Sequence, residues 1–197
     1  MGQGALEEAD PLKLRAFFGL PVPEPQRQEL GRFLESCPAE APQFRWSVAG
    51  NLHLTVRFIG SVERGLVEAI ADRLDGAVGP PFEVALGELG TFSRGRLARV
   101  VWIGTRAGGD AIRALADRVE AECRAAGLPP EQRELKPHLT LARARAREGA
   151  PLPALPSLPE LQPWRAAELI LYSSHLGRAG AVHEPIRTVR LVATPAS

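Results

Sequence analysis

Two copies of one short motif constrain the fold of this chain more than any other feature. His-Leu-Thr-Val occupies residues 53–56 and His-Leu-Thr-Leu occupies residues 138–141, each within alternating apolar residues. Successive side chains on a β-strand point to opposite faces, so the histidine and threonine of each motif share one face and the leucines share the other. Random placement of the chain's histidines and threonines predicts only roughly 0.12 His-x-Thr sequences. We therefore interpret the pair as two related strands.

The sequence around the two motifs repeats at the same offset of 85 residues. Gly19, in Phe-Phe-Gly-Leu, corresponds to Gly104, in Trp-Ile-Gly-Thr, and the apolar segment 82–86 corresponds to 167–171. The individual residues differ, whereas the order of strand, helix, His-Thr strand and further strand is kept. A duplicated unit of this kind predicts two similar lobes.

We therefore predict an α+β fold in which residues 1–197 form one bilobal domain, with residues 1–11 as a flexible N-terminus. Two antiparallel sheets related by a pseudo-twofold axis are expected to line a central cleft, with helices on the outside. In the helix expected after the first motif, Val62, Leu66, Ile70 and Leu74 are predicted to form the buried stripe. Five prolines in residues 150–163 predict a stiff connector rather than a helix. The predicted strands are 14–20, 51–60, 81–92, 96–105, 136–145, 167–176 and 186–194, and the predicted helices are 23–36, 62–78 and 109–127.

Composition excludes several classes of protein. The chain has 24 basic and 23 acidic residues, and this balance argues against a protein that follows a long nucleic-acid backbone, although not against one that grips a single phosphate. Cys37 and Cys123 are far apart and predict neither a disulfide scaffold nor a zinc site. No signal peptide and no apolar run of membrane-spanning length is seen. We expect a cytoplasmic protein that does not bind membranes.

Two histidines on facing strands suit acid–base chemistry at a phosphate. The unperturbed pKa of histidine is about 6.5, so one imidazole can take a proton from water while the other gives a proton to a leaving oxygen. The hydroxyls of Thr55 and Thr140 can donate to the non-bridging phosphate oxygens, and no metal or other cofactor is needed. His175 and His183 lie outside the motif, and we expect them to be exposed and non-catalytic.

The paired motifs and their flanks resemble a known family. The segments Arg-Ala-Phe-Phe-Gly-Leu, Asn-Leu-His-Leu-Thr-Val and Leu-Lys-Pro-His-Leu-Thr-Leu are similar to those of the two-histidine (2H) phosphoesterase superfamily, in its RNA 2',3'-cyclic phosphodiesterase (ThpR/LigT, 2'-5' RNA ligase) branch. The resemblance implies hydrolysis of a terminal RNA 2',3'-cyclic phosphate to a 2'-phosphate. It implies His53 as proton donor to O3', His138 as proton acceptor from water, and Arg143 as a phosphate contact. It also implies reversible 2'-5' RNA ligation.

The two arginines near the motifs differ in strand parity. Arg57 shares the predicted face of His53 and is the second candidate for substrate binding, whereas a regular strand would turn Arg143 away from His138. A bulge or a twist would be needed to re-aim Arg143. Phe17, Phe18, Trp46 and Tyr172 could stack on bases but are more typical of a core.

The same interpretation predicts the binding partner and leaves an alternative function open. The expected partner is RNA with 2',3'-cyclic phosphate ends, either tRNA fragments or small cyclic nucleotides, bound by a monomer. The alternative is a non-catalytic RNA-end or nucleotide-binding module, although binding alone would not need both imidazoles. A metal site is disfavoured because the two strands carry no carboxylate near the histidines.

Overall fold

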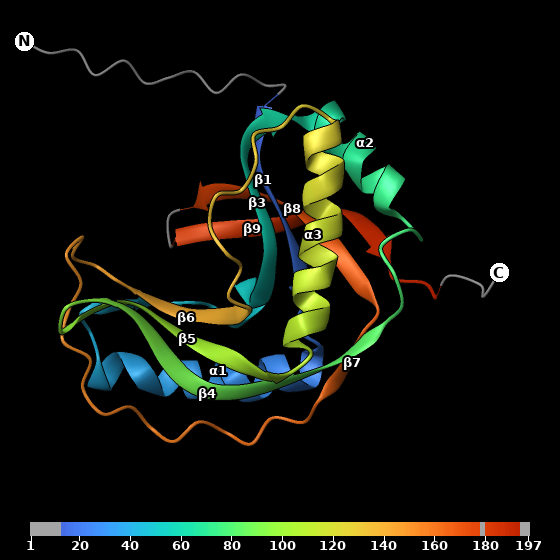
Figure 1. The fold of residues 1–197 in the computed structure, drawn as a ribbon. Coiled ribbons are helices and arrows are strands. Elements are labelled where there is room, and N and C mark those ends of the chain that lie inside the picture. The colour runs from blue at the N-terminus through green and yellow to red at the C-terminus, as the bar shows by residue number, and fades with distance from the viewer. Residues whose placement is uncertain (1–12, 178–179, 194–197) are drawn as a thin grey trace, which may run out of the picture.

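Strands dominate the computed structural model, which describes residues 13–177 and 180–193 (Figure 1). The N-terminal segment 1–11, which we expected to be flexible, lies outside these residues. The elements within them are β1 (Lys13–Pro21), α1 (Glu24–Glu40), β2 (Phe44–Trp46), the 3₁₀ helix η1 (Ala49–Asn51), β3 (His53–Glu63), α2 (Arg64–Leu74), β4 (Phe82–Arg94), β5 (Leu97–Ala107), α3 (Gly109–Ala125), β6 (His138–Ala144), β7 (Trp164–Ala166), β8 (Glu168–Gly177) and β9 (Gly180–Arg190). The α+β class predicted from the sequence is confirmed.

The strand order places the two His-Thr strands next to each other. The order is β7-β4-β5-β6-β3-β1-β8-β9, with β2 paired to β6, and every pairing is antiparallel. Between β3 and β6 the ladder consists of one residue pair, Leu54 and Leu139. The order therefore reads as two halves, β6-β5-β4-β7 and β3-β1-β8-β9, which meet at the motif strands.

The duplication extends to helices α1 and α3, but α2 has no equivalent in the second copy of the repeat. Helices α1 and α3 each span 17 residues and begin 85 residues apart, the offset that separates His53 from His138. In the first half α2 follows β3, whereas residues 151–163 follow β6 with neither helix nor strand. Prolines in that segment remove backbone donors and clash with a helical turn, so the prediction that it forms no helix is confirmed.

The helices lie against the sheet through apolar faces. Leu30, Phe33 and Leu34 of α1 are buried, and so are Ile112 and Val119 of α3. The stripe predicted for α2 is wrong in part, because the buried residues there are Val67, Ile70, Ala71 and Leu74, while Leu66 is exposed. Val62 belongs to β3, so the helix begins later and its buried face is rotated relative to the prediction.

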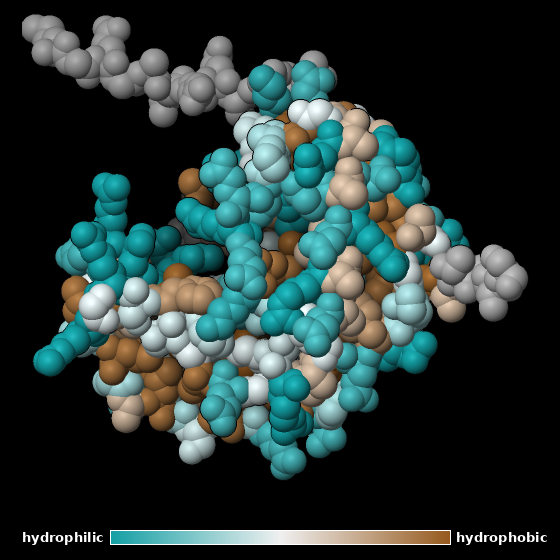
Figure 2. Space-filling view, in the orientation of Figure 1, coloured by the Kyte–Doolittle hydropathy of each residue, from teal (hydrophilic) through white to brown (hydrophobic). Residues whose placement is uncertain are grey.

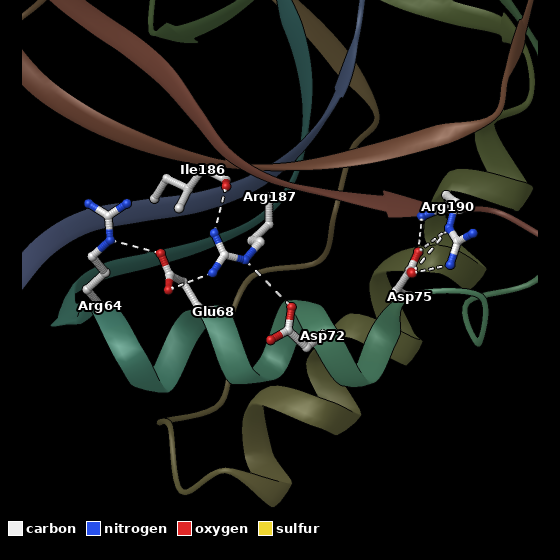
Figure 3. A network of polar contacts seen from close by, with 7 residues as sticks. All are labelled: Arg64, Glu68, Asp72, Asp75, Ile186, Arg187 and Arg190. Carbon is white, nitrogen blue, oxygen red and sulfur yellow. Dashed lines mark hydrogen bonds and ion pairs between the residues drawn. The ribbon is translucent and has the colours of Figure 1, made fainter.

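An ion-pair network attaches α2 to the edge strand β9 (Figure 3). Arg187 contacts Glu68 at 3.0 Å and Asp72 at 3.6 Å, and Arg190 contacts Asp75 at 2.5 Å. These contacts, together with backbone pairing to β8, fix β9 along its length. None of the helices in the described part of the chain is both long and apolar enough to cross a membrane.

Candidate active site

Each His-Thr strand contains a β-bulge immediately after its threonine. Val56 is the extra residue of β3 opposite β1, and Leu141 is the extra residue of β6 opposite β5. The two bulges are 85 residues apart, so they occupy the same place in the two repeats. A bulge reverses the alternation of side chains beyond it. The parity of a regular strand therefore holds for His and Thr of each motif but not for the residues that follow.

The bulge in β3 turns Arg57 away from His53, so the expectation that both share a face is not met. Arg57 is only 8% exposed. Its Nε donates to Glu120 of α3 at 2.6 Å, and a terminal nitrogen donates to the Pro129 carbonyl at 2.7 Å. Glu131 lies 3.6 Å from the same guanidinium. Arg57 thus joins β3 to α3 and the loop that follows it.

The bulge in β6 has the opposite consequence for Arg143. Leu141 and Ala142 are consecutive buried residues, and Arg143 returns to the face of His138. Burial is the largest cause that lowers the pKa of His53 and of His138, and the positive charge of Arg143 is a smaller cause at both, which places the guanidinium within electrostatic reach of both imidazoles. The structure therefore contains the bulge that the position of Arg143 required.

Backbone carbonyls hold both imidazoles in the same way. His53 Nδ1 lies 2.7 Å from the Asn51 carbonyl oxygen, and His138 Nδ1 lies 2.6 Å from that of Lys136. Because a carbonyl oxygen can only accept, Nδ1 carries the hydrogen in each ring and the lone pair of the neutral ring is on Nε2. His53 Nε2 lies 3.1 Å from Thr55 Oγ1, which donates to it in this tautomer. In both neutral rings the lone pair of Nε2 is therefore available to accept a proton.

His53 lies in an aromatic enclosure built from three strands. Its ring centroid is 4.6 Å from Phe17 of β1, 5.8 Å from Tyr172 of β8 and 5.2 Å from His183 of β9. Burial lowers the pKa of His53 to about 4, and the charges of His183, His138 and Arg143 act in the same direction. Before substrate binds, this imidazole is therefore neutral at pH 7.

His138 has a more open environment. Its ring meets the edge of Phe92 at 4.9 Å and lies 6.1 Å from Trp102. Burial lowers its pKa as well, followed by the charges of Arg143 and Lys136. A hollow of about 500 Å³ adjoins this side and is lined by Trp102, Lys136 and Pro137 among others. Figure 2 shows a recess in the surface at the left of the view, where hydrophilic side chains gather.

Sequence reasoning missed three residues of this region. His183, which we expected to be exposed, is half-buried against His53, and its Nδ1 is buried without a hydrogen-bond partner. Trp102 and Lys136 were not singled out, although the repeat offset carries Phe17 onto Trp102 and could have indicated it. His175 is exposed, as expected, and lies 3.9 Å from the Glu184 carboxylate.

Other expectations concern aromatic and metal-binding residues. Phe17 and Phe18 are buried in the core, so their faces are not free for base stacking. Among the described residues, no group of three or more His, Cys, Asp and Glu side chains lies close enough together to hold a metal ion.

Comparison with known proteins identifies the family to which this geometry belongs. The model of the LigT-like phosphoesterase family matches twice in succession, over residues 20–102 and 103–183, so one match falls on each copy of the sequence repeat. The chain belongs to the LigT-like phosphoesterase family. The double match agrees with the repeat seen in the sequence and in the strand order, and it confirms the resemblance read from the motifs.

Curated relatives of this LigT-like phosphoesterase share a name. An RNA 2',3'-cyclic phosphodiesterase of Aeropyrum pernix is 34% identical over 146 residues, which cover 71% of this chain and 82% of the relative. Another, from Methanothermobacter thermautotrophicus, is 30% identical over 190 residues, covering 91% of this chain and 100% of the relative.

Solved structures of related proteins show the same fold. E. coli LigT complexed with 3'-AMP superposes with a TM-score of 0.75 at 25% identity, covering 91% of this chain and 98% of that one. A protein of Thermus thermophilus superposes with a TM-score of 0.76 at 25% identity, covering 91% and 99%. The duplicated fold predicted from the sequence is confirmed.

Proposed function

We propose that this LigT-like phosphoesterase hydrolyses the terminal 2',3'-cyclic phosphate of RNA to a 2'-phosphate, using His53 and His138 as its acid and base. The observation that carries the proposal is the matched orientation of the two imidazoles. Each ring is held through Nδ1 by the carbonyl two residues before it, which leaves Nε2 as the reactive atom. A module that only bound RNA ends would have no use for this arrangement at both histidines. The names of the curated relatives support the same reaction.

The proposed reaction is one in-line displacement at phosphorus. His138 Nε2 accepts a proton from water as the water oxygen bonds to phosphorus. The P–O3' bond breaks with its electron pair remaining on O3', and His53 Nε2–H gives its proton to that oxygen. The product is a 3'-hydroxyl and a 2'-phosphate. Thr55, Thr140 and Arg143 stabilise the charge on the non-bridging oxygens.

The low pKa of His53 makes substrate binding part of this mechanism. With a pKa of about 4 before substrate binds, His53 is not protonated at pH 7. An anionic phosphate placed between the rings favours the imidazolium and raises that pKa, because an opposite charge within a few ångströms stabilises the charged form. The acid therefore forms as the substrate binds.

Further parts of the proposal concern metal, ligation and assembly. The mechanism uses only side chains of the chain, so it proceeds without a metal ion. If the 5'-hydroxyl of a second RNA replaces water, the same displacement joins the two RNAs through a 2'-5' linkage. Both histidines come from one chain, which supports a monomer as the active form.

The first experiment is turnover of adenosine 2',3'-cyclic phosphate in EDTA, with the product identified by ³¹P NMR. Wild type is expected to give the 2'-phosphate, and His53→Ala and His138→Ala are each expected to be slower by a factor of about 10² or more, within the range for loss of a general acid or base. No turnover by wild type, or turnover that neither substitution affects, would contradict the proposal and favour a binding module.

A second substrate tests which histidine is the acid. In thymidine 3'-(4-nitrophenyl phosphate) the leaving nitrophenolate needs no protonation, so loss of the acid matters less than loss of the base. The rate of His53→Ala, as a fraction of the wild-type rate, should therefore be higher on this substrate than on the cyclic phosphate. The corresponding fraction for His138→Ala should stay low on both substrates. The reverse pattern would exchange the two roles.

A further inference from the structure

We infer that the hollow beside His138 binds the phosphodiester and ribose immediately 5' of the terminal nucleotide, so that an RNA chain is preferred over a free cyclic nucleotide. The hollow has a volume of about 500 Å³, and it is lined by Glu88, Trp102, Arg106, Arg113, Lys136 and Pro137, with smaller residues between them. This inference rests on the proposed function, since it names the substrate of the same site.

The two halves of the molecule differ at this point, and only one of them is open. Phe17 and Trp102 correspond at the repeat offset, and each lies beside the histidine of its own half. Phe17 is 2% exposed, because Tyr172 stacks on it at 5.0 Å and His183 meets it edge-on at 5.0 Å. Trp102 is only half-buried and faces the hollow. A substrate chain can therefore extend past His138 but not past His53.

The difference follows from the lengths of the outer strands. β9 spans 11 residues and pairs with β8 from end to end, which brings His183 over Phe17. β7, which takes the outer position at the other end of the strand order, spans 3 residues and pairs with β4 only from Phe82 to Val84. Among the described residues, no such outer strand pairs with the part of β4 that borders the hollow, Gly87 to Leu89.

Two glycines allow the Trp102 ring to lie flat on the strands at the base of the hollow. A Cβ atom on Gly90 of β4 would overlap the six-membered ring of Trp102, and one on Gly104 would lie 3.1 Å from it. The indole can lie flat over the strands only because both positions lack side chains. Its Nε1 is buried without a hydrogen-bond partner, so the ring presents a face rather than a donor.

The charges at the hollow match a phosphodiester. The Lys136 ammonium lies 4.4 Å from the Trp102 ring centroid and 5.7 Å from that of Phe92, a cation–π arrangement that holds it beside His138. Arg106 lines the same hollow and has no ion-pair partner within residues 13–177 and 180–193. Arg113 is partly neutralised by Asp110, at 2.6 Å. The cations therefore outweigh the acidic group described next.

Glu88 is the one carboxylate among the residues that line the hollow. A carboxylate repels phosphate but accepts a hydrogen bond from a hydroxyl, and an RNA chain offers a ribose 2'-hydroxyl next to each phosphodiester. The cations suit the phosphodiester of any nucleic-acid chain, whereas the acceptor for the 2'-hydroxyl distinguishes RNA from DNA.

The test compares kcat/KM for three substrates: adenosine 2',3'-cyclic phosphate, the dinucleotide ApA ending in a 2',3'-cyclic phosphate, and the same dinucleotide with a 2'-deoxy upstream nucleotide. Wild type is expected to prefer the RNA dinucleotide over the mononucleotide by about tenfold or more. Lys136→Gln and Arg106→Gln should each reduce that ratio at least threefold, and Glu88→Gln should reduce the preference for the ribose dinucleotide over the deoxy one. Arg99→Gln is the matched control, because Arg99 is an exposed residue of the same strand as Arg106 and does not line the hollow.

The outcomes separate this inference from the proposed function. Turnover of the mononucleotide with a dinucleotide ratio near one in wild type, or a ratio that Lys136→Gln and Arg106→Gln leave unchanged, would overturn the inference while the function stands. Failure of wild type to turn over any of the three substrates would overturn the function and the inference together.

Discussion

Replacing Arg57 should lower the free energy of unfolding without lowering kcat/KM. Arg57 is 8% exposed and its guanidinium contacts Glu120, Glu131 and the Pro129 carbonyl. Removing one partner of a buried ion pair costs about 3–5 kcal/mol. Glu120 is 23% exposed, so water can solvate part of its charge once Arg57 is gone, and we expect Arg57→Met to cost about 2–3 kcal/mol.

The assay is urea unfolding followed by circular dichroism, together with thermal unfolding. For a chain of this size 1 kcal/mol shifts Tm by roughly 2–4 °C, so Tm should fall by roughly 4–12 °C. The value of kcat/KM, measured at a temperature where the variant is fully folded, should change by less than about twofold. Arg143→Met is the matched control, with the opposite pattern: an exposed arginine whose loss costs less than about 0.5 kcal/mol but lowers kcat/KM.

Two results would refute this reasoning. An unchanged Tm for Arg57→Met would mean that the ion pair with Glu120 contributes nothing to stability. A large fall in kcat/KM for the folded variant would mean that Arg57 reaches the substrate after all, and that the bulge at Val56 does not decide its direction.

Three further predictions concern the histidines and threonines. An NMR titration of the free protein should give a pKa of about 4 for His53, and because the unfolded chain binds this proton near pH 6.5, the free energy of unfolding should fall as the pH drops from 6.5 toward 4; a pKa near 6.5 would contradict the burial argument. His183→Ala should raise the pKa of His53, since it removes both a covering ring and a neighbouring positive charge, and an unchanged titration would show that His183 is a bystander. Thr55→Val and Thr140→Val should each lower kcat/KM by roughly 10²-fold, the loss typical of one donor to a developing oxyanion; rates within twofold of wild type would place the hydroxyls outside the site.

The repeat and the motif pair predict most of the architecture from the sequence. Both predictions agree with the structure because they depend on periodicity and spacing. The motif residues His53, Thr55, His138 and Thr140 precede the bulges and so keep the parity of a regular strand. The helix after the first motif shows where a boundary error propagates. Counting Val62 of β3 as a helix residue aligned the predicted stripe with Leu66, whereas the buried face of the helix is centred on Val67, Ile70, Ala71 and Leu74.

The arginines could not be assigned from alternation, because a bulge is a property of strand pairing rather than of composition. With a bulge at Val56, the residue equivalent to Arg143 in the first half is Phe58, which is 54% exposed, and not Arg57. His183 was missed for a related reason. Its contact with His53 depends on β9 folding back along β8, a long-range arrangement that the local sequence around residue 183 does not reveal.

The strand order has a consequence for how the molecule forms during synthesis. β1 leaves the ribosome before every other strand of its sheet, but its partners are β3 on one side and β8, about 150 residues later, on the other. The enclosure of His53 needs Tyr172 and His183 from β8 and β9, which are made after all the other strands. The first half must therefore wait, with one edge of β1 unpaired, until β8 has been translated. A nascent chain stopped before residue 168 carries both His-Thr motifs but lacks the strands that complete the enclosure of His53.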